Sequence, residues 1–238
     1  MKKILIVGVK GKMGSAVYKV LKNDYEIVEA KRNENWADFK VDLIIDFGSA
    51  ESSVLSAEAA AKMRVPLIIG STGQSKEQFE KIDRLCAGLP YLLCSNFSVG
   101  IVVLKHTIDS ILNVKIDEIA IFEKHHRAKK DAPSGTALSL ERFIKEKQNT
   151  KVQMLSLRGG KEIGFHKVSF YFGSELLELS HAAFSREAFA DGVKIAADFM
   201  LEQKTAKRYD FDEIIKCKFK IKSNIWFDKQ TYKMSKCF

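Results

Sequence analysis

The chain has 238 residues, which is enough for one large domain or two small ones with a sizeable core. With 46% hydrophobic and 29% charged residues, its composition excludes disordered, collagen-like and small disulfide-stapled proteins. The net charge of +9 invites a nucleic-acid hypothesis, but seven lysines and a single acid lie between residues 216 and 238. Because the preceding residues carry only a small positive charge, nucleic acid is not expected as a partner.

The sequence also bears on the compartment. No apolar run approaches the roughly 20 residues of a membrane helix, and the first residues lack the long apolar region of a signal peptide. We therefore expect no membrane partner. The four cysteines, at positions 86, 94, 217 and 237, are spaced too widely for a CxxC metal pair and are typical of reduced thiols. These features predict a cytoplasmic protein.

The first ninety-odd residues alternate between two periodicities. Strands are expected at 4–7, 26–30, 43–46, 66–69 and 91–94, and helices at 12–21, 50–63 and 75–86. This alternation is typical of βαβ units, so it predicts a parallel sheet with helices on both faces.

The pattern changes after residue 96. Helices are expected at 99–112, 134–147 and 186–201, and strands at 118–123, 152–157, 166–171 and 176–180. Strands gathered in sequence favour a mixed or antiparallel sheet, and hence a second, α+β module. The residues Lys216–Lys222 alternate strictly between lysine and other residues, which is typical of a strand.

Glycines mark the first strand-to-helix turn. Gly8, Gly11 and Gly14 occupy the first, fourth and seventh positions of the turn, and Lys10 stands where some variants have a middle glycine. Such a turn lets the backbone approach a pyrophosphate, which the following helix holds with its free N–H groups. A tight turn with only a structural role is the alternative. The position of the turn at residue 8 favours a dinucleotide site of the Rossmann type.

The second expected strand bears on which dinucleotide is used. Glu29 is the nearest acid that could bind the adenosine ribose, and Lys31 and Arg32 follow it. Cations at this place suit a 2′-phosphate and favour NADPH or mixed use of NADPH and NADH. Solvated charges without a ligand are an equally good interpretation.

The segment from Glu123 to Ala137 is the richest in chemistry. Two histidines and four cations lie among eight residues, and they must repel one another unless an anion is bound. Pro133–Thr136 then opens a helix, whose N–H groups form a second anion site. Together they suggest a site for a small molecule with more than one carboxylate. A solvated basic loop is the main alternative, and adjacent histidines rarely bind one metal, so no metal is expected.

These residues resemble those of a known family. The run Glu123-x-His-His-x-x-x-Lys129-x-Asp-Ala-Pro-Ser-Gly-Thr136 is similar to the motif of 4-hydroxy-tetrahydrodipicolinate reductases, also called dihydrodipicolinate reductases. Further motifs follow in the family's order, at Gly8–Gly14, Asp46–Phe47, Gly70–Gly73, Ser95–Gly100, Arg158–His166 and His181–Gly192. The resemblance covers roughly residues 1–215.

The resemblance implies roles for individual residues. His125 would be the proton donor and Lys129 a second catalytic cation. The substrate would be bound by His126, Ser134, Gly135 and Thr136. The cofactor, NADPH or NADH, would be bound by Gly8, Val9, Lys10, Gly11, Lys12, Met13, Lys31, Arg32, Gly70, Ser71, Thr72, Cys94, Ser95, Asn96 and Phe97.

The resemblance also implies a domain organisation. A Rossmann-type dinucleotide-binding domain would comprise residues 1–96 and 186–215, and an inserted α+β domain at 97–185 would bind substrate and build a homotetramer. Residues 216–238 would form a basic C-terminal tail without a counterpart in the family.

The function that the resemblance implies is the NAD(P)H-dependent reduction of a cyclic, dicarboxylated imine, 4-hydroxy-tetrahydrodipicolinate, to tetrahydrodipicolinate in the diaminopimelate route to lysine. Another Rossmann-type oxidoreductase acting on a small dicarboxylate is one alternative, since a fold does not fix its chemistry. A non-catalytic nucleotide sensor is the other.

Overall fold

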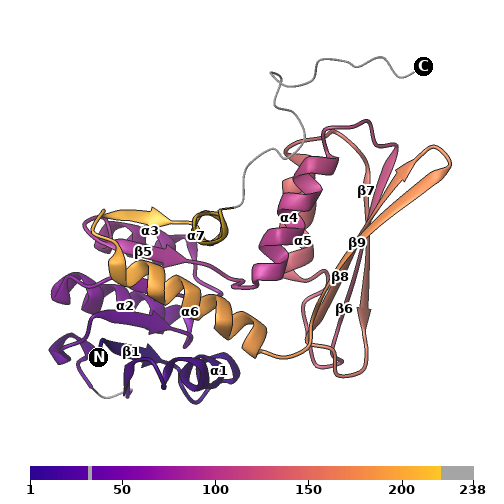
Figure 1. Ribbon diagram of the computed structural model, residues 1–238. Coiled ribbons are helices and arrows are strands. Elements are labelled where there is room, and N and C mark those ends of the chain that lie inside the picture. Colours follow the sequence, from indigo (N-terminus) through magenta and orange to yellow (C-terminus); the bar gives the residue numbers. More distant parts are fainter. Residues whose placement is uncertain (32–33, 221–238) are drawn as a thin grey trace. The chain divides into compact units, whose positions relative to one another are not determined.

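The computed structural model describes residues 1–31 and 34–220, and these form two compact units (Figure 1). The first unit consists of Met1–Val99 and Ser185–Lys218, and the second is built on Gly100–Phe184. The first unit is thus assembled from two separate stretches of the chain. The sequence predicts the two crossings after residues 96 and 185.

A six-stranded sheet forms the centre of the first unit. Its strands lie in the order β10-β5-β4-β3-β1-β2, and every neighbouring pair is parallel. Their bounds are β1 Lys3–Val7, β2 Glu26–Glu29, β3 Leu43–Asp46, β4 Leu67–Ile69, β5 Pro90–Leu93 and β10 Lys207–Tyr209. The parallel sheet predicted from the first ninety residues is confirmed, and β10 joins its edge from the C-terminal stretch.

Within the described part of the chain, five helices accompany this sheet: α1 Lys12–Leu21, α2 Ala50–Met63, α3 Lys76–Leu85, α6 Glu187–Glu202 and α7 Phe211–Phe219. A short 3-10 helix spans Trp36–Asp38. Helices α1 and α6 pack together, and α2 packs against α3. Ser75 caps α3 through a reciprocal pair of hydrogen bonds with Gln78.

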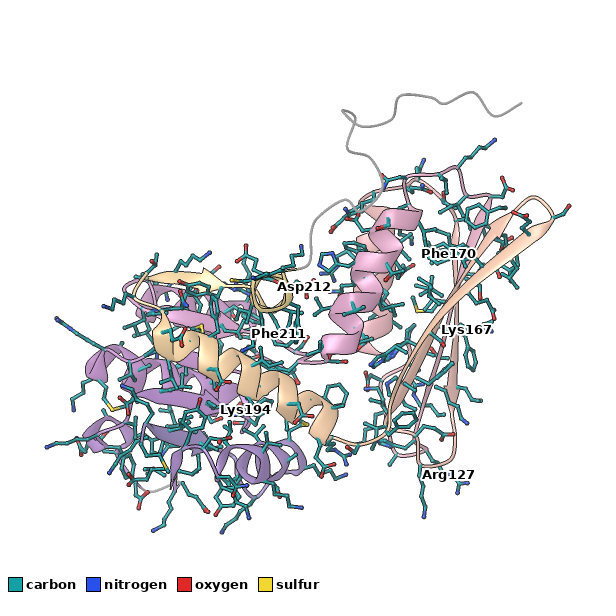
Figure 2. All side chains as sticks on the ribbon, viewed as in Figure 1. Arg127, Lys167, Phe170, Lys194, Phe211 and Asp212 are labelled. Carbon is teal, nitrogen blue, oxygen red and sulfur yellow. The ribbon has the colours of Figure 1, made fainter. Side chains whose placement is uncertain are left out.

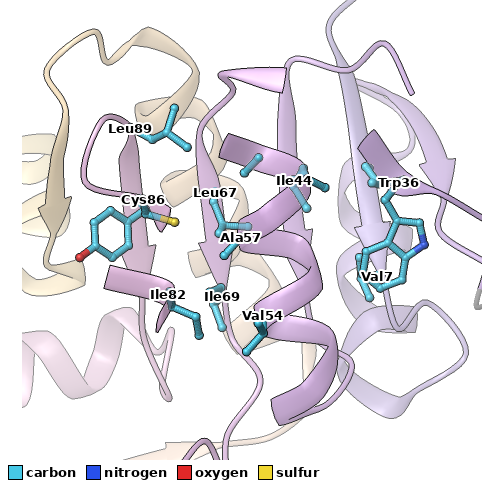
Figure 3. Packing of buried hydrophobic residues seen from close by; sticks show 14 residues of the cluster. Val7, Trp36, Ile44, Val54, Ala57, Leu67, Ile69, Ile82, Cys86 and Leu89 are labelled. Carbon is cyan, nitrogen blue, oxygen red and sulfur yellow. The ribbon is translucent and has the colours of Figure 1, made fainter. Parts of the chain in front are cut away.

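The core beneath α2 and α3 explains why these strands are so apolar (Figure 3). Ile44, Leu67 and Ile69 have no exposed surface, and they lie under Ala57 of α2 and Ile82 of α3. Burying each large aliphatic side chain contributes about 1.5–3 kcal/mol to folding. Alanines on α2 let the helix approach the sheet closely. The carboxyl ends of the strands are thereby fixed, and the loops that follow them are anchored.

The second unit contains a mixed four-stranded sheet in the order β7-β6-β8-β9. Its strands are β6 Glu118–His125, β7 Val152–Arg158, β8 Gly164–Phe172 and β9 Glu175–Ala183, and its helices are α4 Val99–Ile111 and α5 Gly135–Lys145. β6 and β7 are parallel, whereas β6–β8 and β8–β9 are antiparallel. The predicted α+β module is confirmed.

The two faces of this sheet differ. Phe170 lies on the face covered by α4 and α5, where it packs in the apolar core, while Lys167 lies on the other face (Figure 2). β6 shows the same alternation, with its buried positions running from Ile119 through Ile121 and Glu123 to His125. Apolar residues thus give way to two ionisable ones along the same buried face.

The strand predicted over Lys216–Lys222 is wrong where it can be compared. Lys216–Phe219 form the last turn of α7, because Phe211, Ile214 and Ile215 are spaced to bury one helical face. Residues 221–238 lie outside the described part of the chain. Among the described residues, no helix is long and apolar enough to cross a membrane.

Candidate active site

The β1–α1 turn brings backbone segments so close that side chains cannot fit between them. Gly8 has a φ of +84°, and a Cβ there would lie 2.6 Å from the carbonyl oxygen of Phe47. A Cβ at Gly14 would collide with the carbonyl oxygen of Gly8. The Gly11 N–H donates to that same carbonyl at 2.9 Å. Glycine is therefore required at Gly8 and Gly14 for the turn to close.

The start of α1 is prepared for an anion. Its N-cap, Gly11, provides no side chain to bind the first N–H groups, and no acid lies in the first turn. Lys12 begins the helix, and both Lys10 and Lys12 are exposed. N–H groups, the helix dipole and two cations all favour a bound phosphate. The predicted residues Gly8–Met13 thus fit the pyrophosphate of a dinucleotide.

Two further predicted loops follow neighbouring strands of the same sheet. Gly70 comes directly after β4, and a Cβ there would collide with the ring of Phe47. Phe97, after β5, is buried with its ring centroid 5.7 Å from that of Phe47 and 5.2 Å from that of Phe211. Because ligands of parallel α/β sheets bind beyond the carboxyl ends of the strands, Gly70–Thr72 and Cys94–Phe97 are suitably placed for a dinucleotide.

Asp46 holds the loop between β3 and α2 from inside. The carboxylate is fully buried at the end of β3 and accepts hydrogen bonds from the Gly48 N–H (2.9 Å), Ser52 Oγ (3.1 Å) and Ser56 Oγ (2.7 Å). Burial raises the pKa of Asp46, while these hydrogen bonds act in the opposite direction. Its contacts are all used within the protein, so Asp46 holds the loop and is not aimed at a ligand.

The predicted 2′-phosphate residues are only partly described. Lys31 is largely exposed, and its ammonium lies 3.5 Å from the carboxylate of Glu34. Arg32 lies outside the described residues. A phosphate bound at Lys31 would therefore compete with Glu34 for the same cation.

In the second unit, ionisable groups gather on the buried face at the end of β6. Glu123 is fully buried, and its Oε2 contacts His125 Nδ1. Arg158, at the end of the parallel strand β7, donates to both carboxylate oxygens of Glu123, at 2.9 and 2.6 Å. The Ser134 N–H donates to Glu123 Oε1 at 3.2 Å. These contacts join β6, β7 and the start of α5.

The electrostatics of this group follow from its contacts. Burial opposes ionisation of Glu123, but the hydrogen bonds from Arg158 and the other donors outweigh it and hold its pKa at about 2. Burial lowers the pKa of His125; Glu123 raises it, and Lys129 and Arg158 lower it further. The ring of His166 on β8 lies 5.2 Å from that of His125, and burial together with the nearby His125 and His181 lowers its pKa to about 3.

The loop that follows β6 carries the other predicted residues. Lys129 is about three-quarters buried and forms an ion pair with Asp131 at 2.7 Å. Ser134 Oγ caps α5 at the Ala137 N–H and lies 3.3 Å from His166 Nε2. Arg127 is exposed at the end of this unit (Figure 2). Acids therefore offset part of the repulsion expected among the cations of this segment.

The structure brings the predicted residues together in two groups, one in each unit. His125, His126, Lys129 and the start of α5 belong to the second unit, and the glycine-rich loops belong to the first. Sequence analysis assigned no role to Glu123, Arg158 or His166. Two sequence indications existed: the spacing of Glu123 and His125, which places both on one face of a strand, and the family-like motifs that contain Glu123, Arg158 and His166.

The fold and these residues define a class. A Rossmann-type sheet with glycine turns indicates a pyridine nucleotide, and a buried histidine beside cations suits proton transfer to an anionic substrate. The chain is therefore a pyridine-nucleotide oxidoreductase. Family models described as "Dihydrodipicolinate reductase, N-terminus" and "Dihydrodipicolinate reductase, C-terminus" match residues 2–97 and 100–215. The chain belongs to the dihydrodipicolinate reductase family, whose reaction is part of lysine and diaminopimelate biosynthesis.

Individual relatives agree. A 4-hydroxy-tetrahydrodipicolinate reductase of Campylobacter jejuni is 33% identical over 240 residues, which cover 90% of this chain and 98% of the relative. One from Bdellovibrio bacteriovorus is 34% identical, covering 85% and 91%. The dipicolinate-bound dihydrodipicolinate reductase of Paenisporosarcina sp. TG-14 has the same fold, with a TM-score of 0.72 at 21% identity over 90% of this chain and 99% of that one.

Proposed function

We propose that this chain reduces 4-hydroxy-tetrahydrodipicolinate to tetrahydrodipicolinate with NADPH or NADH, and that His125 is the proton donor. The observation that carries the proposal is the buried pair of His125 and Glu123, followed along the chain by Lys129 and the start of α5. The names of the relatives support the choice of substrate.

The residues of the second unit would divide the work as follows. Glu123 faces His125 Nδ1, so Nε2 is the nitrogen from which a proton can reach the ring of the substrate. Lys129 would stabilise negative charge on the substrate, and its contact with Asp131 shows that it already attracts a carboxylate. His126 and the start of α5 at Gly135 and Thr136 would hold the substrate carboxylates. Ser134 would support them by capping that helix.

The first unit would hold the cofactor at Gly8–Met13, Gly70–Thr72 and Cys94–Phe97. Loss of water from the 4-hydroxy compound precedes or accompanies the reduction, and the reduced pyridine nucleotide, when bound, would supply the hydride for ring position 4. Lys31 and Arg32 would strengthen NADPH binding through the 2′-phosphate, while NADH would also bind.

The test follows absorbance at 340 nm with the full chain, each cofactor in turn, and substrate generated in the cuvette by the preceding synthase. The proposal predicts oxidation of the cofactor that requires the synthase product. Oxidation that does not depend on that product, or none while the cofactor still binds, would contradict it. A panel of other small dicarboxylates tests the alternative of a different oxidoreductase.

We also propose a homotetramer in the cytoplasm. The face of the second unit's sheet opposite α4 and α5 exposes Leu155, Leu157, Tyr171 and Leu176, as would suit packing against a second copy. The free thiols of Cys86 and Cys217, among the described residues, support a reducing compartment. Light scattering of the intact protein should give the mass of four chains, and the mass of one chain would contradict this assembly.

A further inference from the structure

Glu123 is surrounded by donors although it lies in the interior. His125 Nδ1 and Arg158 Nη1 contact Oε2, and Arg158 Nη2 and the Ser134 N–H contact Oε1. A buried carboxylate is stable only when it is paired and hydrogen-bonded, and here both oxygens are. Arg158 supplies the bidentate geometry that matches a carboxylate best.

An ionised carboxylate can only accept a hydrogen bond, so His125 Nδ1 must carry the hydrogen in their contact. This fixes the tautomer of the neutral ring and leaves Nε2 as the nitrogen that gains and loses the proton. The space beside Nε2 is kept open by Gly164 of β8, where a Cβ would lie 3.2 Å from Nε2. Glu123 therefore sets the tautomer of His125, and Gly164 leaves room beside the nitrogen that carries the transferred proton.

Charged and titratable groups face His125 from every surrounding element. Glu123 of β6 favours the imidazolium, whereas Lys129 of the following loop and Arg158 of β7 disfavour it. The ring of His166 of β8 also faces His125, and its own pKa of about 3 leaves it neutral. Among these groups, Glu123 is the anion that contacts the ring. Without its charge, no contacting anion would oppose burial and the two cations, Lys129 and Arg158, that lower the pKa of His125.

Arg158 also reaches the loop that carries Lys129. Its Nε and Nη2 donate to the backbone carbonyl of Asp131, at 3.2 and 2.5 Å. One guanidinium thus ties the carboxylate beside His125 to the residue that pairs with Lys129. A change at Arg158 would loosen both parts of the proposed proton-transfer site.

We propose that Glu123 and Arg158 are positioning residues for the reduction. Glu123 holds His125 with Nε2 as the proton-donating nitrogen. Arg158 holds Glu123 and the Asp131 backbone in place through its hydrogen bonds to both. This inference rests on the proposed function, because His125 is the proton donor there. It adds two residues, from β6 and β7, whose observed contacts are with His125, Ser134 and the Asp131 backbone.

The decisive variant is Glu123→Gln, which keeps the size of the side chain and removes its charge. Turnover should fall about 30-fold while the KM for substrate changes less than threefold, because the substrate-binding groups remain. A general acid must be protonated, so activity falls as pH rises through its pKa. Loss of the anion lowers that pKa, and the alkaline limb of the turnover profile should move about one unit to lower pH.

Two other variants separate charge from geometry. Arg158→Lys keeps the charge but loses the bidentate contact, so turnover should fall about tenfold. Because the charge near His125 is unchanged, the alkaline limb of the pH profile should stay within about 0.3 unit of wild type. Glu58→Gln is the matched control, since Glu58 pairs with Lys81 at 2.7 Å in the first unit and neither residue belongs to the candidate site. It should change neither turnover nor the pH profile.

A readout without substrate distinguishes this inference from the proposed function. Nitrogen-15 NMR of the histidines in the full wild-type chain should show neutral His125 with its proton on Nδ1, and His125→Gln assigns the signal. A proton on Nε2, or an alkaline limb that does not move in folded Glu123→Gln, would overturn the inference. The wild-type spectrum decides the matter if Glu123→Gln does not fold, and failure of the wild-type chain to turn over substrate would refute the proposed function alone.

Discussion

The β1–α1 turn and the segment from β6 to α5 are both strand-to-helix connections, yet they prepare for anions by different means. In the turn, Gly8 and Gly14 allow backbone segments to approach closely, which leaves the N–H groups at the start of α1 available to an anion. The nearby Lys10 and Lys12 are exposed. In the segment, Glu123 and His125 are buried on the sheet face and Arg158 is mostly buried beside them.

The two sites tolerate different kinds of change. A site made of backbone is insensitive to single charges but cannot accept an added Cβ, because its contacts are already at van der Waals distance. A site made of buried charges accepts small steric changes but depends on each partner, since removing one leaves the others uncompensated. The following predictions test this contrast.

The largest effect is expected at Lys129. In Lys129→Ala, kcat/KM should fall about 100-fold, or about 2.7 kcal/mol, because a substrate carboxylate would lose its counter-charge. Lys130→Ala is the matched control: the neighbouring lysine is exposed, and its loss should leave kcat/KM within threefold. Equal losses in both variants would mean that the net charge of the loop matters and the position of Lys129 does not.

A smaller effect is expected in the turn. Gly14→Ala should weaken cofactor binding about 30-fold, measured by fluorescence titration of the reduced cofactor, because the new methyl group collides with the Gly8 carbonyl. Gly88→Ala serves as the control in the same unit, since a Cβ at Gly88 meets nothing within 4 Å. Wild-type affinity in a folded Gly14→Ala protein would remove the turn from the cofactor site.

The choice between cofactors should depend on charge even in the backbone-built unit. Replacing Lys31 and Arg32 together by alanine should weaken NADPH about tenfold, the worth of about one charge-assisted hydrogen bond, and leave NADH nearly unchanged. Glu34→Gln, which removes the competing acid beside Lys31, should instead strengthen NADPH severalfold. Parallel changes for both cofactors would show that these residues support the fold.

The smallest effect is expected at the C-terminal end. Residues 221–238 contain none of the candidate site residues, so truncation after Lys220 should leave kcat and KM within threefold, or about 0.7 kcal/mol. α7 stays whole in this variant, and with it the buried Phe211, Ile214 and Ile215. Loss of activity without loss of folding or assembly would mean that the active site includes part of the removed segment.

The backbone-built turn could be predicted from the sequence, whereas the partners of the buried charges could not. The turn at Gly8–Gly14 is local, so glycine spacing after an apolar strand is sufficient to predict it. The partner of Glu123 is Arg158, 35 positions away, and they meet because β6 and β7 pair in parallel with His125 opposite Arg158. Glu123 likewise lies opposite His166 through the β6–β8 register. Such registers depend on packing that periodicity does not reveal.

The elements missed by the sequence have equally specific causes. Lys207–Tyr209 is a three-residue edge strand with two exposed residues, too short to show a period. Lys216–Phe219 alternates like a strand over four residues, but burial of Phe211, Ile214 and Ile215 continues the helix through it. Tertiary packing therefore decides between helix and strand where the pattern is short.

The account depends most on His125 as the proton donor, and one comparison tests it directly. Turnover of His125→Gln is measured with saturating cofactor and synthase-generated substrate, together with the cofactor dissociation constant of the same preparation. The account predicts a fall in turnover of about 100-fold, as expected for loss of a general acid, with the dissociation constant within twofold of wild type. Turnover within threefold of wild type would contradict it.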